Sequence, residues 1–235
     1  MAKPVLGYFV SGTDTDVGKT LVASSLLYAL THAGIRTAGI KPVAAGAEWR
    51  EGMWHNDDAE ALAAQASVKV PARLSTPYLL QQPVAPHIAA ALEGKTIVLS
   101  HILDCYRQIA QRADVVVVEG VGGFRVPLTQ TTDTADLAQQ LDLPVILVVG
   151  LRLGCISHAL LTVEAISARG LSLAGWVANT VDADMLSIDA NVEALVSRIT
   201  APFLGRIPRL SQDAKLASMA ACLDFSRLPG WPVPS

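Results

Sequence analysis

Short apolar runs alternate along the chain with longer segments in which apolar residues recur every three or four positions. The runs predict strands at residues 5–10, 37–43, 115–118, 144–149, 173–178 and 203–207. The helical spacing predicts helices at residues 19–33, 57–66, 135–141 and 185–199, within 92–112, and in a segment that ends at Gly170. Alternating strands and helices predict right-handed βαβ units. The expected fold class is therefore α/β, a three-layer sandwich with a mostly parallel central sheet and helices on both faces.

Residues 12–20, with the sequence GTDTDVGKT, join the first expected strand to the first expected helix. In that context a Gly-Lys-Thr motif forms a phosphate-binding loop (P-loop), whose backbone N–H groups surround phosphate oxygens at a helix N-terminus. Lys19 would reach the β- and γ-phosphates, and the Thr20 hydroxyl would bind Mg²⁺. The usual motif has its first glycine at the position of Thr13, whereas Gly12 stands one residue earlier. A chance Gly-Lys-Thr is the alternative, but the flanking strand and helix favour a P-loop that binds ATP or GTP.

The residues that follow the strands are the next candidates, because ligands of open parallel sheets bind beyond the carboxyl ends of the strands. Lys41 lies in an apolar strand pattern; it either stabilises charge during phosphoryl transfer or extends from the strand end to solvent. Glu119 ends a run of valines and would bind Mg²⁺ directly or through water. The glycines that follow it would admit a ligand close to the backbone, or simply form a turn. Asp58 would complete an oxygen shell around Mg²⁺, with a role at a helix N-terminus as the alternative.

Two later strands also end in polar segments. The helix start at residues 153–158 offers free N–H groups that could bind a substrate carboxylate. Cys155 within it has no readable His or Asp partner in the sequence, so we interpret it as a packing residue. Asn179 follows the strand at 173–178, and its side-chain amide could read an adenine edge.

Composition limits the classes of protein. About half of the 235 residues are apolar, which is enough for a sizeable core. A net charge of −3, with charges of both signs interspersed, predicts no nucleic-acid partner. The longest apolar stretch is too short to span a bilayer and no signal peptide is recognisable, so we expect no membrane association and a cytoplasmic location. We expect a single P-loop domain at residues 1–227 and a Pro-rich, poorly ordered tail at 228–235.

Taken in this order, the segments that follow the strands resemble dethiobiotin synthetases. The resemblance runs from Tyr8 to about Leu210 and is carried by residues 12–20, 41–43, 56–58, 86–88, 118–123, 154–156 and 175–179. The displaced first glycine of the P-loop is the form that this family uses. The combination of the P-loop with Lys-Pro-Val and Gly-Trp-Val-Ala-Asn is far more specific than any one of these motifs.

The resemblance implies ATP- and Mg²⁺-dependent closure of the ureido ring of dethiobiotin from 7,8-diaminononanoate and CO₂ or bicarbonate. The diamine would first form a carbamate, whose oxygen would attack the γ-phosphate of ATP. The second amine would then attack the resulting carbamic-phosphoric anhydride and expel phosphate. Because the substrate tail crosses a subunit interface in this family, the resemblance also implies a homodimer.

The resemblance gives each candidate residue a role. Lys19 and Lys41 would be catalytic, stabilising the transferring phosphoryl group and the carbamate. The metal ligands would be Thr20, Asp58 and Glu119. Further contacts with the nucleotide would come from Asp16, Val17, Gly18, Leu21, Gly120, Val121, Gly122, Asn179, Thr180, Pro208, Arg209 and Leu210. Further contacts with the amine substrate would come from Thr13, Ala45, Gly154, Cys155 and Ser157.

Several positions depart from the usual residues of that family. Ala45 stands for a serine, Val121 for an alanine and Ser157 for an asparagine; Ala85, Arg152 and Asp16 are further departures. Val121 adds bulk near the substrate, and each departure costs at most the equivalent of a hydrogen bond or a methylene, roughly 1–3 kcal/mol. A paralogue with another amine substrate therefore stays open. Two further alternatives are a related P-loop synthetase that forms amides and an ATP-driven partitioning switch.

Overall fold

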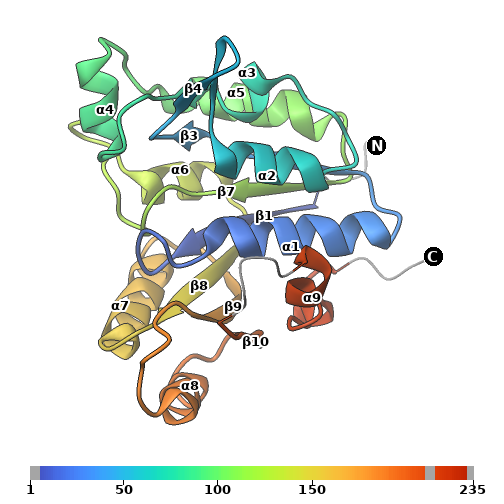
Figure 1. Cartoon of the computed structure of the whole chain (residues 1–235), viewed down its shortest axis with the longest axis vertical. Coiled ribbons are helices and arrows are strands. Elements are labelled where there is room, and N and C mark those ends of the chain that lie inside the picture. Colours follow the sequence, from blue (N-terminus) through green and yellow to red (C-terminus); the bar gives the residue numbers. More distant parts are fainter. Residues whose placement is uncertain (1–5, 210–214, 232–235) are drawn as a thin grey trace.

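The computed structural model of the chain describes residues 6–209 and 215–231. Within these residues six strands form one sheet in the order β10-β9-β8-β1-β7-β2, and every neighbouring pair is parallel (Figure 1). The strands are β1 (Leu6–Gly12), β2 (Thr37–Ile40), β7 (Val115–Glu119), β8 (Val145–Leu151), β9 (Leu173–Thr180) and β10 (Phe203–Ile207). They correspond to the six runs expected from the sequence, so the α/β fold class is confirmed.

Helices cover both faces of this sheet and complete three layers (Figure 1). One face carries α1 (Lys19–His32), α2 (Asp57–Gln65) and α9 (Leu216–Ala220). The other carries α3 (Ala72–Ser75), α4 (Pro86–Leu92), α5 (Leu99–Ala110), α6 (Thr134–Leu141), α7 (Cys155–Ala168) and α8 (Ile188–Val196). Successive side chains of a strand point to opposite faces, which explains why the strands read as continuous apolar runs. None of the helices in the described residues is long and apolar enough to cross a membrane.

The strand expected at residues 37–43 is divided. β2 ends at Ile40, and Val43–Ala44 forms β3, which pairs with β6 (Tyr78–Leu79) in a separate two-stranded sheet. Pro42 between them has no backbone N–H to donate, so the ladder of the main sheet stops there. The division places Lys41 at the edge of the main sheet.

A hairpin of β4 (Glu48–Arg50) and β5 (Met53–His55) was not expected from the sequence. Its side chains are exposed or half-buried, so it lacks the buried alternate face that makes a strand recognisable. Its central residues adopt positive φ angles, 50° at Glu51 and 82° at Gly52, as a tight hairpin turn requires. The edge-to-face pair of Trp49 and Trp54, with ring centroids 5.3 Å apart, joins the two strands.

Residues 228–231 of the expected tail pack against the α1 side of the sheet. Leu228 is buried, and the ring of Trp231 stacks on Phe225 at 5.8 Å between centroids. The Tyr8 hydroxyl, from the central strand β1, donates to the carbonyl of Pro229 at 2.9 Å. These four residues therefore contact the domain, residues 232–235 lie outside the described part of the chain, and poor order of the tail stays a prediction. The domain boundary at residue 227 stays a prediction.

Tyr8→Phe should remove a loss of stability that the wild type shows at high pH. Burial raises the pKa of Tyr8 from its ordinary 10.0 to about 12. The folded protein thus favours the neutral phenol, and this contribution to the free energy of unfolding is complete below pH 10 and lost as the pH rises toward 12. Across that window the group costs the wild type about 1.4 kcal/mol per pH unit. Denaturant unfolding of both proteins from about pH 9 to about pH 11 measures the difference, and equal slopes would contradict it.

Candidate active site

The P-loop occupies residues 12–18 between β1 and α1, at the carboxyl edge of the sheet. Gly18 precedes α1 in the left-handed region, with φ 93°. A Cβ on Gly12 would lie 2.6 Å from Cγ2 of Val17, and one on Gly18 would overlap Nδ2 of Asn179. The loop therefore closes on itself and on the end of β9 where glycines permit it.

Lys19 begins α1 and folds back over the P-loop. Its Nζ donates to the carbonyl of Asp14 at 2.9 Å, and the side chain is almost fully buried. Burial, reinforced by the nearby charge of Lys41, lowers the pKa of Lys19 from 10.5 to about 8. The ammonium thus lies within the loop that a phosphate group would enter.

Four polar side chains from separate parts of the chain meet beside the loop, and we call them the Lys41 cluster: Thr20, Lys41, Asp58 and Glu119. Nζ of Lys41 lies 2.5 Å from Oε1 of Glu119 and 2.8 Å from Oδ2 of Asp58. The Thr20 hydroxyl lies 2.7 Å from Oδ1 of Asp58 and 2.8 Å from Oε1 of Glu119. These residues follow β2, end β7 and open α2 and α1, so the parallel topology brings them to one point.

Burial and charge oppose each other in this cluster. Burial alone would lower the pKa of Lys41, but Glu119 and Asp58 raise it above its ordinary value. Burial alone would raise the pKa of Asp58, but Lys41 holds it below its usual range. Burial raises the pKa of Glu119 against the pull of Lys41. Lys41 is 4% exposed, so it does not extend to solvent, which was the alternative interpretation.

The N-terminus of α2 carries both a helix cap, Asn56, and a carboxylate of the cluster, Asp58. The Asn56 side chain caps the helix by accepting from the N–H of Ala59 at 3.1 Å. Asp58, two residues later, points into the Lys41 cluster. The capping residue therefore positions the carboxylate that the cluster uses.

Two cavities meet at the P-loop. The first, of about 780 Å³, contains seven of the residues expected to contact the nucleotide: Asp16, Gly18, Leu21, Asn179, Thr180, Pro208 and Arg209. The second, of about 860 Å³, contains the Lys41 cluster with Lys19, Ala45, Val121 and Gly122. Asp16, Gly18 and Leu21 line both. The arrangement can hold the base of a nucleotide in the first cavity, its phosphates at the P-loop where the two cavities meet, and a second reactant in the second cavity.

Other expected site residues lie elsewhere. Gly154, Cys155 and Ser157 line neither cavity, and Cys155 is buried in the apolar cluster around α7 and α8. Thr13 directs its hydroxyl to β8, where it accepts from the N–H of Gly150 at 3.4 Å. Val17 is buried, and the N–H of Gly120 donates to the carbonyl of Val10 on β1. Leu210 lies outside the described residues.

Asn179 connects β9 to the P-loop. Its Nδ2 donates to the carbonyl of Val17 at 2.9 Å. The same amide occupies the space that a Cβ on Gly18 would need. The same side chain would therefore have to contact adenine, as expected, and keep its hydrogen bond to the P-loop.

The structure brings to the site further residues that had no role assigned from the sequence. Pro83, Val84, Pro86 and Val126 line the second cavity, and Asp182 and Met219 line the first. Arg152 pairs with Asp14 of the P-loop. A strand-end position could have pointed to Arg152, which follows β8. The apolar residues carry no comparable signal.

Known proteins resemble this chain at two levels. A family model described as "AAA domain" matches residues 6–215. The ATP-dependent dethiobiotin synthetase BioD of Janthinobacterium sp. (strain Marseille) is 58% identical over 228 residues, which cover 95% of this chain and 96% of that protein.

Solved structures resemble the chain in fold alone. The cell division protein FtsY of Thermotoga maritima is 12% identical with a TM-score of 0.50, and the match covers 94% of this chain and 69% of that one. FtsY of Elizabethkingia anophelis in complex with GDP is 13% identical with a TM-score of 0.48, over 96% of this chain and 65% of that one. The chain thus spans about two thirds of the length of these structures.

Proposed function

Because the chain belongs to the family of ATP-dependent dethiobiotin synthetases, we propose that it closes the ureido ring of dethiobiotin from 7,8-diaminononanoate, CO₂ or bicarbonate, and ATP. The observation that carries the proposal is the position of the Lys41 cluster. It lies beside the P-loop and in the second cavity, where a reactant would approach the γ-phosphate. Phosphoryl transfer needs such positioning and charge stabilisation more than covalent chemistry.

The nucleotide would lie across both cavities. Its base would enter the first cavity near Asn179 and Pro208, and its phosphates would bind the P-loop N–H groups at the start of α1. Lys19 would exchange the Asp14 carbonyl for a phosphate oxygen, which is the stronger partner because it is charged.

Mg²⁺ fits the oxygen groups of the cluster. The Thr20 hydroxyl has one proton but lies within hydrogen-bond distance of two carboxylates, and among the described residues nothing bonds to Oε2 of Glu119. Thr20, Asp58 and Glu119 would hold the ion, which would neutralise charge on the phosphates. No group of three or more His, Cys, Asp or Glu side chains suited to a metal occurs in the described residues, so phosphate oxygens would complete the shell.

The reaction would proceed by three transfers. An amine of the substrate adds to CO₂ and loses a proton, which gives a carbamate. A carbamate oxygen then attacks the γ-phosphorus, and ADP leaves. The second amine attacks the carbonyl carbon of the mixed anhydride, the ring closes and phosphate leaves. Lys41 would stabilise the carbamate and the transferring group by its charge, and it holds no covalent intermediate.

The second cavity suits an aliphatic diamine. Pro83, Val84, Val121 and Val126 give part of its wall an apolar surface for the alkyl chain. Ala45 and Val121 depart from the usual residues and both line this cavity. This keeps a related synthetase with another amine as the second candidate function.

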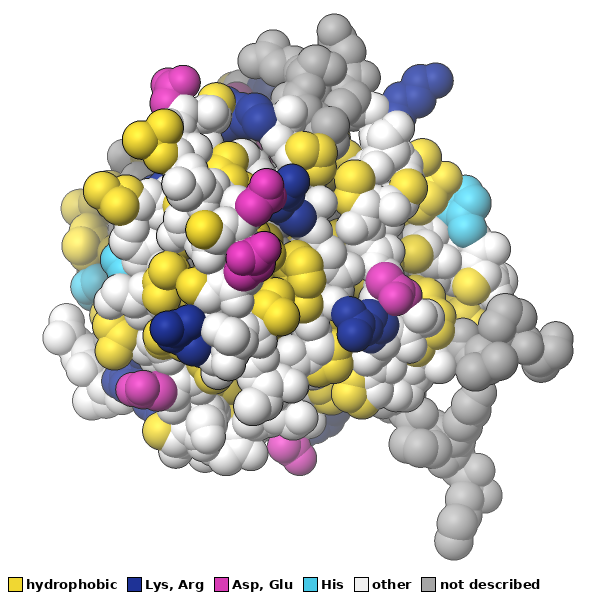
Figure 2. Space-filling model, turned by 90° about the horizontal axis from the view of Figure 1, so that it is seen from below, with side chains coloured by type: hydrophobic (Ala, Val, Ile, Leu, Met, Phe, Trp, Pro, Cys, Tyr) yellow, Lys and Arg dark blue, Asp and Glu magenta, His cyan; other side chains and the backbone are white. Residues whose placement is uncertain are grey.

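The carboxylate end of the substrate would need a second subunit. Gly154 and Ser157 lie outside both cavities, at the exposed N-terminus of α7, where Leu153 is 95% exposed. Figure 2 looks onto the end of the molecule that carries α8, where hydrophobic side chains lie in patches between charged ones. Leu161 and Leu186 are among the exposed apolar residues of α7 and of the segment before α8. A homodimer would cover such residues and supply the missing contacts; sedimentation as a monomer would contradict it.

Product formation tests the proposed function. Purified protein with ATP, Mg²⁺, bicarbonate and 7,8-diaminononanoate should yield dethiobiotin by mass spectrometry. Lys19→Ala should lower the yield by about 10²–10³-fold, because one preorganised charge at the phosphates is lost. ATP hydrolysis that does not depend on the diamine would sink the proposal, and turnover of another diamine alone would favour the second candidate.

A further inference from the structure

The second cavity owes part of its wall to the segment between β7 and α6. Val121, Gly122 and Val126 belong to this segment and line the cavity. The segment contains one isolated bridge, between Pro127 and Asp133, and otherwise no regular secondary structure. Its position is therefore set by individual hydrogen bonds and side-chain contacts and not by a helix or a sheet ladder.

Thr134, the first residue of α6, holds the inner side of the segment. Its buried hydroxyl donates to the carbonyl of Phe124 at 2.6 Å and accepts from the N–H of Val126 at 3.0 Å. The N–H of Thr134 donates to the carbonyl of Val126 at 2.9 Å. The cavity residue Val126 is thus bound directly to the start of α6.

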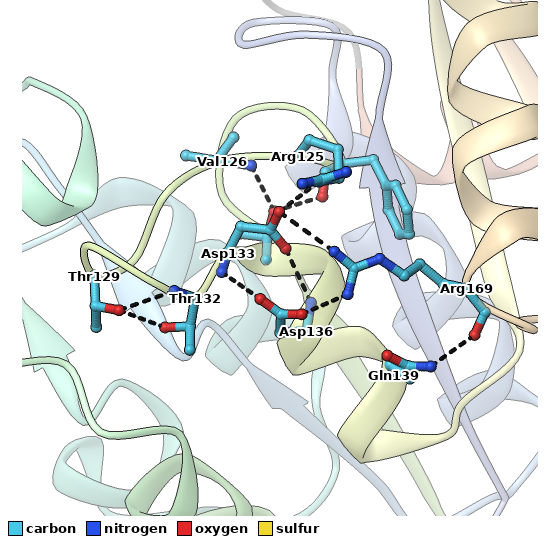
Figure 3. Close-up of polar contacts among 10 residues, drawn as sticks. Arg125, Val126, Thr129, Thr132, Asp133, Asp136, Gln139 and Arg169 are labelled. Atoms are coloured by element: carbon cyan, nitrogen blue, oxygen red, sulfur yellow. Dashed lines mark hydrogen bonds and ion pairs between the residues drawn. The ribbon is translucent and has the colours of Figure 1, made fainter.

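Two arginines hold the outer side, and Figure 3 shows both of them next to the carboxylate of Asp133. Oδ2 of Asp133 pairs with Nε of Arg125 and lies 3.7 Å from Nη2 of Arg169. Arg169, directly after α7, also pairs with Asp136 through Nη1. We call Arg125, Asp133, Asp136 and Arg169 the Arg169 cluster. It joins the cavity segment to α6 and to the end of α7.

Three members of the cluster are better protected than an ordinary surface pair, whereas Arg125 is 60% exposed. The side chain of Asp133 is 13% exposed and that of Arg169 is 23% exposed. Asp133 and Asp136 also form the capping box of α6, with backbone-to-carboxylate distances of 2.8 and 3.0 Å. Changing either aspartate would damage the helix, whereas changing Arg169 leaves the capping box in place.

Val126 is close enough to the P-loop for a shift of its side chain to affect the loop. Gly122 has φ 62°, and a Cβ there would lie 2.9 Å from Cγ2 of Val126 and 3.5 Å from Oγ1 of Thr15. The glycine therefore lies between Val126 and the P-loop. A displaced Val126 would change the space on the substrate side of the phosphates.

We propose that Arg169 is a positioning residue for the amine substrate. By holding Asp133, and through it Arg125, it fixes the cavity wall at Val126. It touches neither substrate nor nucleotide. The inference rests on the proposed function, because it takes the second cavity as the amine site.

Arg169→Met tests this role, with Arg169→Lys as the conservative variant. Methionine should raise KM for 7,8-diaminononanoate about fivefold while kcat and KM for ATP stay within about twofold. Hydrogen exchange of residues 120–133 should become faster, and lysine should restore part of both effects. Val126→Ala should raise KM for the diamine by a smaller factor in the Arg169→Met background than in the wild type, because both substitutions act on the same cavity wall.

Arg107→Met is the matched control, since it removes an exposed arginine paired with Asp104 on α5, outside both cavities. It should change none of these values. An unchanged KM for the diamine in Arg169→Met would overturn the inference, even if the melting temperature fell. If the wild type formed no dethiobiotin, the proposed function would fail. Hydrogen exchange would still test whether Arg169 fixes the position of residues 120–133, and unchanged exchange in Arg169→Met would overturn that role.

Discussion

Lys41→Met should abolish most of the synthetase activity and also destabilise the fold. Nζ of Lys41 lies 2.5 Å from Oε1 of Glu119, whose side chain is buried. Methionine fills a similar volume but leaves a buried carboxylate without its cation, which costs about 3–5 kcal/mol of unfolding free energy. Loss of the charge at the transferring group should lower kcat by about 10²–10³-fold. Urea unfolding and single-turnover formation of dethiobiotin measure the two effects separately.

A second substitution separates stability from chemistry. Glu119→Gln in the Lys41→Met background removes the unpaired charge, so stability should recover while activity does not. Lowering the pH should also restore stability to the Lys41→Met variant, because Glu119 then becomes protonated and loses its charge. In that variant the folded-state pKa of Glu119 is raised, so its stabilising contribution is present at low pH and is lost as the pH rises.

Lys95→Met is the control for a paired lysine at the surface. Lys95 lies 2.7 Å from Glu93 and is 47% exposed, so its loss should cost less than about 1 kcal/mol and leave turnover unchanged. If Lys41→Met unfolded at the same urea concentration as the wild type, the buried ion pair would not contribute to stability. Full turnover by that variant would remove Lys41 from phosphoryl transfer.

The sequence predicts the central sheet well because its strands are buried on both faces. The valines at 115–118 have no polar residue among them, and a short run of this kind is typical of a strand that is buried on both faces. The β4–β5 hairpin has the opposite character, since its aromatic side chains are exposed and follow no buried alternation. Its pairing depends on a turn and on Trp49 meeting Trp54, which spacing alone does not reveal.

The site is predictable to the extent that it follows strand ends. Lys41 and Glu119 follow or end strands that are neighbours in the sheet, so their meeting is implied by topology. Whether Lys41 reaches a carboxylate or solvent depends on side-chain direction, which the pattern leaves open. The Arg169 cluster is further from prediction, because Arg169 and Asp133 are joined by the packing of α6 against the end of α7 rather than by any motif.

Gly18→Ala should weaken nucleotide binding by about 10²-fold, the cost of moving a positioning loop by roughly 1 Å. Gly18 has φ 93° and ψ 30°, a conformation that costs a non-glycine residue about 1 kcal/mol. The added Cβ would also overlap Nδ2 of Asn179, which donates to the carbonyl of Val17 at 2.9 Å. Either Asn179 moves and that bond breaks, or the P-loop shifts away from the phosphates. Calorimetric titration with ADP and Mg²⁺ measures the loss.

Gly34→Ala separates the overlap from the backbone strain. Gly34 has φ 79°, but its Cβ would meet nothing within 4 Å, so this variant should lose about 1 kcal/mol of stability and no nucleotide affinity. In an Asn179→Ala background, Gly18→Ala should add little to the loss that Asn179→Ala causes alone, since the overlapping atom is gone. If the two substitutions reduced nucleotide affinity by fully additive amounts, the effect of Gly18→Ala would come from backbone strain at residue 18 and not from the overlap with Asn179. Nucleotide affinity unchanged in Gly18→Ala would show that the P-loop tolerates a shift at this position.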